Sequence, residues 1–181
     1  MKSRRLLDYI TDYEDVIKTV SEVSINKETP LIDSEFKCIC FDEVKTQYFN
    51  KNNSKAYSCS NDALISFKGI DCFVEFKDTD DVDGKELYKK IRDSLLIYLD
   101  IMDVKLSDTK DSLGYILVYN PLKNKNYDYK YIEDNVHGFS GPYNREVKHL
   151  RKNLEGLYFK YVYCMTPSEF ELELKKYSED I

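Results

Sequence analysis

The sequence predicts a single α/β domain in which a mixed central β-sheet is flanked by helices. Segments with apolar residues at helical spacing alternate along the chain with short β-rich runs. The run LGYILVYN, residues 113–120, is almost continuously apolar, which suits a strand covered on both faces. The 181 residues suffice for one sizeable core. We therefore expect one domain over 1–181, with its core at about 5–120 and a C-terminal β-α extension at about 121–181.

The N-terminal half is predicted to contain a helix, a strand and a hairpin. Residues 5–24 place apolar side chains three and four positions apart, as in an amphipathic helix. These side chains are Leu6, Ile10, Tyr13, Ile17 and Val20. The run 36–41 predicts a strand, which 56–59 can continue after a polar stretch. Residues 60–78 form two apolar runs around Gly69, which fits the first central position of a tight hairpin turn.

The C-terminal half begins with a helix over 84–103, because apolar residues recur there at helical spacing. The strand 113–120 follows and stops at a proline. The remainder is predicted as a loop, a basic helix, a strand and a helix, over residues 121–141, 144–156, 157–165 and 166–177. Thr166 and Glu169 match the capping box that opens a helix.

Composition restricts the function classes. The net charge of -6 argues against a protein that coats nucleic acid non-specifically, because such binding needs many lysines and arginines. No apolar run has the length of a signal peptide or a membrane span, so we expect a cytoplasmic protein without a membrane partner. The five cysteines are an odd number and should be reduced, small core residues.

Charged residues interrupt the predicted hairpin at 60–78. If Gly69 and Ile70 form a two-residue turn, alternation places six apolar side chains on one face. These are Ala63, Ile65, Phe67, Cys72, Val74 and Phe76. On the other face, Asp62 pairs with Lys77, and Glu75 lies beside them. The sequence therefore predicts that two carboxylates and one ammonium group converge.

This combination predicts metal-assisted hydrolysis of phosphodiester bonds. Mg²⁺ is usually held by one or two carboxylates, and water and substrate phosphate complete its coordination. Asp62 and Glu75 can supply those carboxylates to Mg²⁺ or Mn²⁺. Lys77 can then position the attacking water or stabilise developing negative charge.

The pattern Asp62, twelve intervening residues and then Glu75-Phe76-Lys77 resembles the PD-(D/E)XK nuclease superfamily. In that family an aspartate opens the second core strand and E-x-K lies in the third. The element order also resembles its α-β-β-β-α-β, restriction-endonuclease-like core. The resemblance implies a Mg²⁺-dependent nuclease in which Asp62 and Glu75 bind the metal and Lys77 is the catalytic lysine.

Two further positions bear on this resemblance. Many members also use a glutamate on the first helix, and Glu14 lies on the apolar side of the helix predicted here. As an alternative, Glu14 is an ordinary acid on a helix surface. The chain departs from the family pattern at Asn61, where the family name records a proline.

The basic residues concentrate on two predicted helices. On a nuclease, they could contact the phosphates of a nucleic-acid substrate. The candidates are Lys89, Arg92, Arg145, Lys148 and Arg151, and Lys90 belongs to the same concentration. The alternative interpretation for each is a solvated helix face.

A second function class fits the same fold. Asp62 and Lys77 can form an ordinary cross-strand ion pair with Glu75 in solvent. The chain would then be a non-catalytic acidic binding protein of the immunity or antitoxin type. Its net charge of -6 would speed its encounter with a basic partner protein. A protein partner or a homodimer is compatible with both classes.

Overall fold

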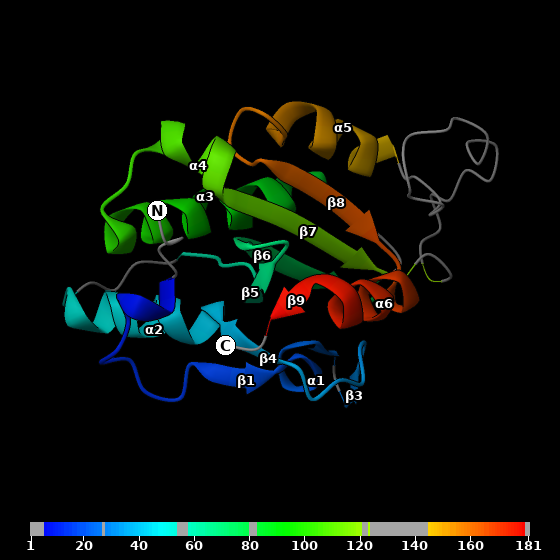
Figure 1. Ribbon diagram of the computed structural model, residues 1–181, viewed down its shortest axis with the longest axis horizontal. Coiled ribbons are helices and arrows are strands. Elements are labelled where there is room, and N and C mark those ends of the chain that lie inside the picture. The colour runs from blue at the N-terminus through cyan, green and yellow to red at the C-terminus, as the bar shows by residue number, and fades with distance from the viewer. Residues whose placement is uncertain are drawn as a thin grey trace.

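The protein is an α/β structure built on one mixed sheet (Figure 1). This computed structural model describes residues 6–26, 28–53, 58–79, 83–120, 123 and 145–179, and only the backbone at 145–148 and 177–179. The strands are β1 Ile17–Thr19, β2 Ile25–Asn26, β3 Thr29–Pro30, β4 Lys37–Cys40, β5 Ala63–Phe67, β6 Ile70–Lys77, β7 Leu113–Tyr119, β8 Tyr161–Met165 and β9 Ser178–Glu179. The helices are the 3₁₀ turn η1 Leu6–Asp8, α1 Val20–Val23, α2 Phe41–Lys51, α3 Gly84–Met102, α4 Leu106–Ser112, α5 Arg145–Leu154 and α6 Pro167–Tyr177.

The main sheet has the order β1-β4-β5-β6-β7-β8, and β9 lies beside β5. The neighbouring strands from β1 to β6 are antiparallel, whereas β6, β7 and β8 are parallel. The prediction of a mixed sheet with helices is therefore confirmed. The C-terminal extension completes this sheet, because β8 pairs with β7 and β9 pairs with β5.

Both faces of the sheet are covered. On one face, Phe73 of β6 shares an apolar cluster with Phe41 of α2, Leu95 of α3 and Leu154 of α5. On the other face, Val74 shares a second cluster with residues of α1 and α6. The site-bearing face of the hairpin is thus mostly core, with Asp62, Glu75 and Lys77 at one end and the buried pair Ser66 and Asp71 at the other.

The predicted helix over 5–24 is wrong. The segment forms η1, a turn, β1 and the short α1. Its buried residues do not lie on one face of a helix. Ile10 packs in one apolar cluster, and Val20 packs in the cluster on the opposite side of the sheet. Ile17, which the helical pattern assigned to the core, is 40% exposed and pairs with Ile39. The β-branched run around it favours a strand.

Two helices were not predicted. The first, α2, follows β4 directly, so the predicted continuation strand at 56–59 is not found at residues 58 and 59, and 56–57 lie outside the described part. The signal for α2 was present, since Phe41 and Val44 are buried at helical spacing and Asp42 favours its N-terminus. The second, α4, is short and mostly polar, so it carries little periodic signal.

The hairpin is confirmed, but its register differs by two residues from the prediction. Phe67 pairs with Ile70, so the turn residues are Lys68 and Gly69, with φ of 52° and 75°. Both positive values fit a type I′ turn, whose twist matches that of the strands. Ile70 then joins β6, and its partly buried side chain packs against the apolar cluster that contains Val74. In the predicted turn position, Ile70 would lose this contact. A shift of two residues preserves every side-chain face.

The elements from residue 84 onward lie closer to their predicted positions. The helix predicted at 84–103 is α3 and the strand at 113–120 is β7, which is buried throughout. The basic helix is confirmed as α5, while β8 begins at Tyr161 rather than at residue 157. The capping box of α6 is formed, since the Thr166 amide donates to Glu169 Oε2 over 2.8 Å. The loop predicted at 121–141 lies outside the described residues, except for position 123.

The cysteines and the helices bear on two further expectations. All five thiols are free, and three of them are buried in the core: Cys38, Cys40 and Cys72. Cys59 and Cys164 are half-buried. In the part of the chain that is described, no helix combines the length and apolarity needed to cross a membrane.

Gly114 on β7 tests how tightly the sheet is packed. A β-carbon at this position would lie 2.4 Å from Cys72 Sγ, in a buried contact between paired strands. We expect Gly114→Ala to lower the free energy of unfolding by about 1–3 kcal/mol, as overpacked cores do. Urea denaturation would measure this loss. In a Cys72→Ala background the cost should shrink, and an equal cost in both backgrounds would contradict this explanation.

Candidate functional site

Asp62 immediately precedes β5 and is held by two parts of the chain. Its backbone carbonyl accepts from the Phe41 amide over 3.0 Å, at the start of α2. Its Oδ2 accepts from the Phe76 amide over 2.7 Å, on β6. Burial raises the pKa of the Asp62 carboxyl, and Lys90 and the Phe76 amide oppose that shift. The carboxylate is thus a fixed, poorly solvated group.

Glu75 on β6 is the most deeply buried acid of the cluster, with a side chain that is 0% exposed. Its Oε1 lies 2.6 Å from Lys90 Nζ and 3.2 Å from Lys77 Nζ. Its Oε2 is buried and has no hydrogen-bond partner among the described residues. Burial, followed by the neighbouring Asp62, raises the pKa of Glu75 to about 8. One oxygen of this carboxylate therefore has unused capacity to accept a hydrogen bond or to bind a cation.

Tyr115 on β7 carries a second orphaned polar group next to this strand. Its hydroxyl is buried and lacks a hydrogen-bond partner within the described chain. Tyr115 pairs with Phe73, two residues before Glu75, and so lies on the same face. Burial raises its pKa well above the ordinary value, and the Glu75 carboxylate adds to that shift.

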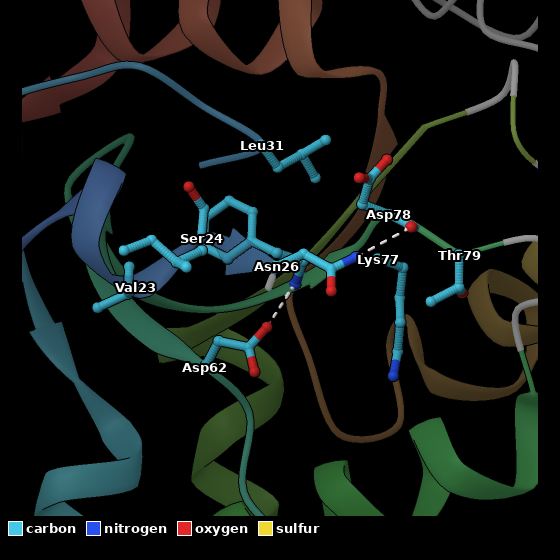
Figure 2. Close-up of a pocket in the computed structure, with 10 residues that line it drawn as sticks. Val23, Ser24, Asn26, Leu31, Asp62, Lys77, Asp78 and Thr79 are labelled. Atoms are coloured by element: carbon cyan, nitrogen blue, oxygen red, sulfur yellow. Dashed lines mark hydrogen bonds between the residues drawn. The ribbon is translucent and has the colours of Figure 1, made fainter. Parts of the chain in front are cut away.

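Lys77 ends β6 and faces a pocket of about 220 Å³. Its Nζ lies 3.2 Å from Glu75 Oε1 and 2.8 Å from Glu86 Oε1 on α3. Figure 2 shows Lys77 and Asp62 lining this pocket together with Asn26 of β2. The pocket therefore adjoins the cluster at Lys77 and Asp62, and Glu75, Glu86 and Lys90 are not among its lining residues.

Lys90 on α3 joins buried Glu75 to half-buried Asp62. Its Nζ lies 3.2 Å from Asp62 Oδ1 and 2.6 Å from Glu75 Oε1. Burial lowers the pKa of Lys90, but Glu75 and Asp62 more than compensate, so its net pKa is raised and the group is charged. The next turn of α3 holds the chain before β5, because Ser94 Oγ accepts from the Asn61 amide over 2.8 Å.

The structure brings together three of the four predicted catalytic residues. Asp62, Glu75 and Lys77 lie at one end of the hairpin, although the contacts differ from the prediction. Continuing the observed register by one residue places Asp62 opposite Glu75 rather than Lys77. The interpretation of Glu75 as a solvated strand residue is wrong, since α3 covers it.

Glu14 is not brought to this site. The helix that was to carry it is absent, and Glu14 lies exposed on a loop before β1. Its backbone amide donates to Gln47 Oε1 over 2.9 Å, near the middle of α2. Within the described residues, no hydrogen bond or ion pair links the Glu14 carboxylate to Asp62 or Glu75.

The candidate phosphate contacts have different settings. Lys89 and Arg92 are exposed on α3, and Arg92 also bonds Asp93 over 2.8 Å. Arg151 on α5 is half-buried and lies 3.0 Å from Glu155. Arg145 and Lys148 also belong to α5, but their side chains lie outside the described part.

Sequence reasoning missed Lys90 and Glu86 as members of the cluster. Lys90 was grouped with solvated basic residues, yet it lies three positions after buried Leu87 and four before buried Ser94. That spacing puts it on the flank of the helix face that packs against the sheet. The ion pairs that join β6 to α3, Lys77 with Glu86 and Glu75 with Lys90, depend on how the helix packs on the sheet. The spacing of residues along the sequence does not predict them.

The cluster can be tested for its fit to a divalent cation. Among the residues that the structure describes, no group of three or more histidines, cysteines, aspartates and glutamates is arranged to hold a metal ion. Mg²⁺ often needs only one or two protein carboxylates, and Asp62 with the orphaned Glu75 Oε2 supplies such a pair. The donor set therefore fits a hard cation, provided that the Lys90 ammonium yields its place.

Comparisons with protein-family models, curated proteins and solved structures found no match to this chain. The class of protein must therefore be argued from its own fold and site. These define an α/β protein with a buried carboxylate–lysine cluster at one end of a β-hairpin.

Proposed function

We propose that the protein is a divalent-metal-dependent nuclease with a restriction-endonuclease-like core. The observation that carries this proposal is Glu75: a fully buried carboxylate with one oxygen unpartnered, beside Lys77 and close to Asp62. An uncompensated buried polar atom is costly to a protein unless it serves a ligand or a reaction. A pocket lined by Lys77 and Asp62 adjoins this cluster.

The order of elements supports the same proposal. β4, β5 and β6 form an antiparallel meander in the sheet, and α3 then crosses to the parallel β7. Apart from α2 between β4 and β5 and the short α4 before β7, this order is similar to the β-β-β-α-β part of the core that the motif resemblance implies. The first α of that core has no counterpart in the described N-terminal segment, where β1 takes its place.

Each residue has a role in this proposal. Asp62 and Glu75 would hold Mg²⁺ or Mn²⁺, and the bound ion would supply Lewis-acid stabilisation of charge on the scissile phosphate. Lys77 would donate hydrogen bonds to a phosphate oxygen or orient the attacking water. Glu86, 2.8 Å from Lys77 Nζ, holds that ammonium in position.

Nucleic acid would approach along α3. Lys89 and Arg92 are exposed on this helix, whose first turn carries Glu86 beside Lys77. They can contact phosphates and orient the backbone without reading sequence. Arg145, Lys148 and Arg151 on α5 are further candidates for such contacts, and local contacts of this kind are compatible with a net charge of -6.

Cleavage assays with matched variants test the proposal. We expect the parent to bind Mn²⁺ in calorimetry and to cleave plasmid, single-stranded DNA or RNA only when the metal is present. Asp62→Asn should lose both properties, whereas Lys77→Met should lose about a hundredfold or more in cleavage and still bind metal. Lys110→Met, an exposed lysine on α4, should behave as the parent.

Failure of the parent to bind Mn²⁺ or cleave any of the three substrates would overturn the proposal. So would full cleavage by Asp62→Asn or Lys77→Met.

A second candidate function rests on the internal charge pairing. Lys90 forms ion pairs with both Asp62 and Glu75 within the chain, so the cluster can be a finished structural element that needs no metal. The protein would then be a non-catalytic acidic partner of the immunity or antitoxin type. Co-purification from its host with a basic protein in fixed stoichiometry, together with no cleavage, would favour this function.

A further inference from the structure

Lys90 lies between the two carboxylates that are the candidate metal ligands. Its Nζ is 2.6 Å from Glu75 Oε1 and 3.2 Å from Asp62 Oδ1, and its side chain is 19% exposed. No other described ammonium contacts both acids, because Lys77 reaches Glu75 and Glu86 instead. A single internal cation therefore bridges the pair.

The charges of the cluster show that this bridge excludes a second cation. When all five groups are ionised, two lysines, Lys77 and Lys90, face three carboxylates, Asp62, Glu75 and Glu86, which leaves one net negative charge. Adding a divalent ion while Lys90 stays would reverse the sign of a buried cluster at close range, where repulsion is poorly screened. Metal and ammonium should thus occupy the site in turn.

The ammonium group of Lys90 can move away from Asp62 and Glu75 while its backbone stays in place. Its backbone is fixed by α3, whose neighbouring residues Leu87 and Ile91 are buried. Its ammonium is carried by a flexible four-carbon stem, which can release the head group toward solvent. Glu75 Oε2 has no partner in the described structure, so one ligand oxygen is available before Lys90 moves.

We propose that Lys90 is a built-in competitor for the metal, which holds Asp62 and Glu75 together in the metal-free protein and must be displaced when a divalent cation binds. This inference rests on the proposed function. It assigns Lys90 a positioning role that opposes metal affinity and lowers the cost of keeping two acids buried without metal.

Calorimetric titration of Mn²⁺ into the full chain would test this role, with thermal unfolding as a second readout. Lys90→Met should bind Mn²⁺ at least about tenfold more tightly than the parent, because one repelling charge has been removed. Without metal it should unfold at a lower temperature, and saturating Mn²⁺ should restore that loss.

Three variants complete the design. Lys85→Met removes the same charge from the first turn of α3 without touching the acids, so its Mn²⁺ affinity should stay within about twofold of the parent. Lys90→Arg retains the charge and should keep the parent's affinity. If Lys90→Met fails to fold, Lys90→Gln keeps the test open, since it is neutral and can still donate a hydrogen bond.

The outcomes separate this inference from the proposed function. A parent that binds Mn²⁺ and cleaves, with neutral Lys90 variants of unchanged affinity, would overturn the role of Lys90 alone. Binding by the Lys90 variants but not by the parent would support the role of Lys90 and overturn the nuclease. No binding by any variant would overturn both.

Discussion

Glu75→Gln is expected to reduce Mn²⁺-dependent cleavage by about a hundredfold to a thousandfold, because it removes the charge of one of only two candidate metal ligands. The same variant should change how stability depends on pH. Burial raises the pKa of Glu75 to about 8 from its ordinary 4.5, so the folded protein binds a proton that the unfolded chain releases. The contribution of Glu75 to stability is therefore full below pH 4.5 and is lost as pH rises through about 8.

Between pH 4.5 and about 8, the folded state binds one proton more than the unfolded chain does. The free energy of unfolding should therefore fall by about 1.4 kcal/mol for each pH unit in this window. Urea denaturation at several pH values would measure the slope for the parent and for Glu75→Gln, in which the fall should be clearly smaller because the Glu75 proton no longer contributes. Glu86→Gln removes a carboxylate that is 48% exposed and also contacts Lys77, and it should retain the parent's slope. Identical slopes for the parent and Glu75→Gln would contradict the assignment.

Phe73→Ala is expected to lower the free energy of unfolding by about 3–5 kcal/mol, the usual cost of truncating a fully buried phenylalanine. Phe73 is 0% exposed and makes edge-to-face contacts with three other aromatic rings. Their centroids lie 4.9 Å (Phe41), 5.7 Å (Tyr98) and 6.5 Å (Phe159) from that of Phe73. Removing the ring should leave a cavity between the sheet and its helices, which chemical denaturation would detect.

Phe76→Ala provides the matched comparison on the same strand. Phe76 is half-buried, and its ring contacts that of Phe170 on the opposite face at 5.8 Å. Its truncation should cost clearly less than that of Phe73, because fewer contacts are lost. Equal losses for the two variants would show that Phe73 does not anchor the cluster under α2, α3 and α5.

Prediction succeeded where local pattern and burial coincide. The helix α3 has apolar residues at helical spacing because one of its faces packs against the core. The strand β7 is almost continuously apolar because it is buried throughout. The segment 5–24 failed because its apolar residues happen to recur at helical spacing while they fill cores on opposite sides of the sheet. Such a division between two layers is invisible to a one-dimensional pattern.

The candidate site shows the same limit in more detail. Alternation along β6 placed Glu75 and Lys77 on one face, and the error of two residues in the register left that placement intact. Alternation could not show that α3 closes over Glu75 or that Lys90 binds it. Helical spacing in residues 5–24 placed Glu14 on a helix that does not form.

The sequence by itself determined the α/β class, the hairpin, the helix that follows it and the convergence of Asp62, Glu75 and Lys77, because these depend on periodicity within short segments. Only the tertiary structure decided the burial of Glu75, its unpartnered oxygen and the bridging ammonium of Lys90. These properties arise from how α3 packs on the sheet. Contacts between elements depend on the global fold rather than on local spacing.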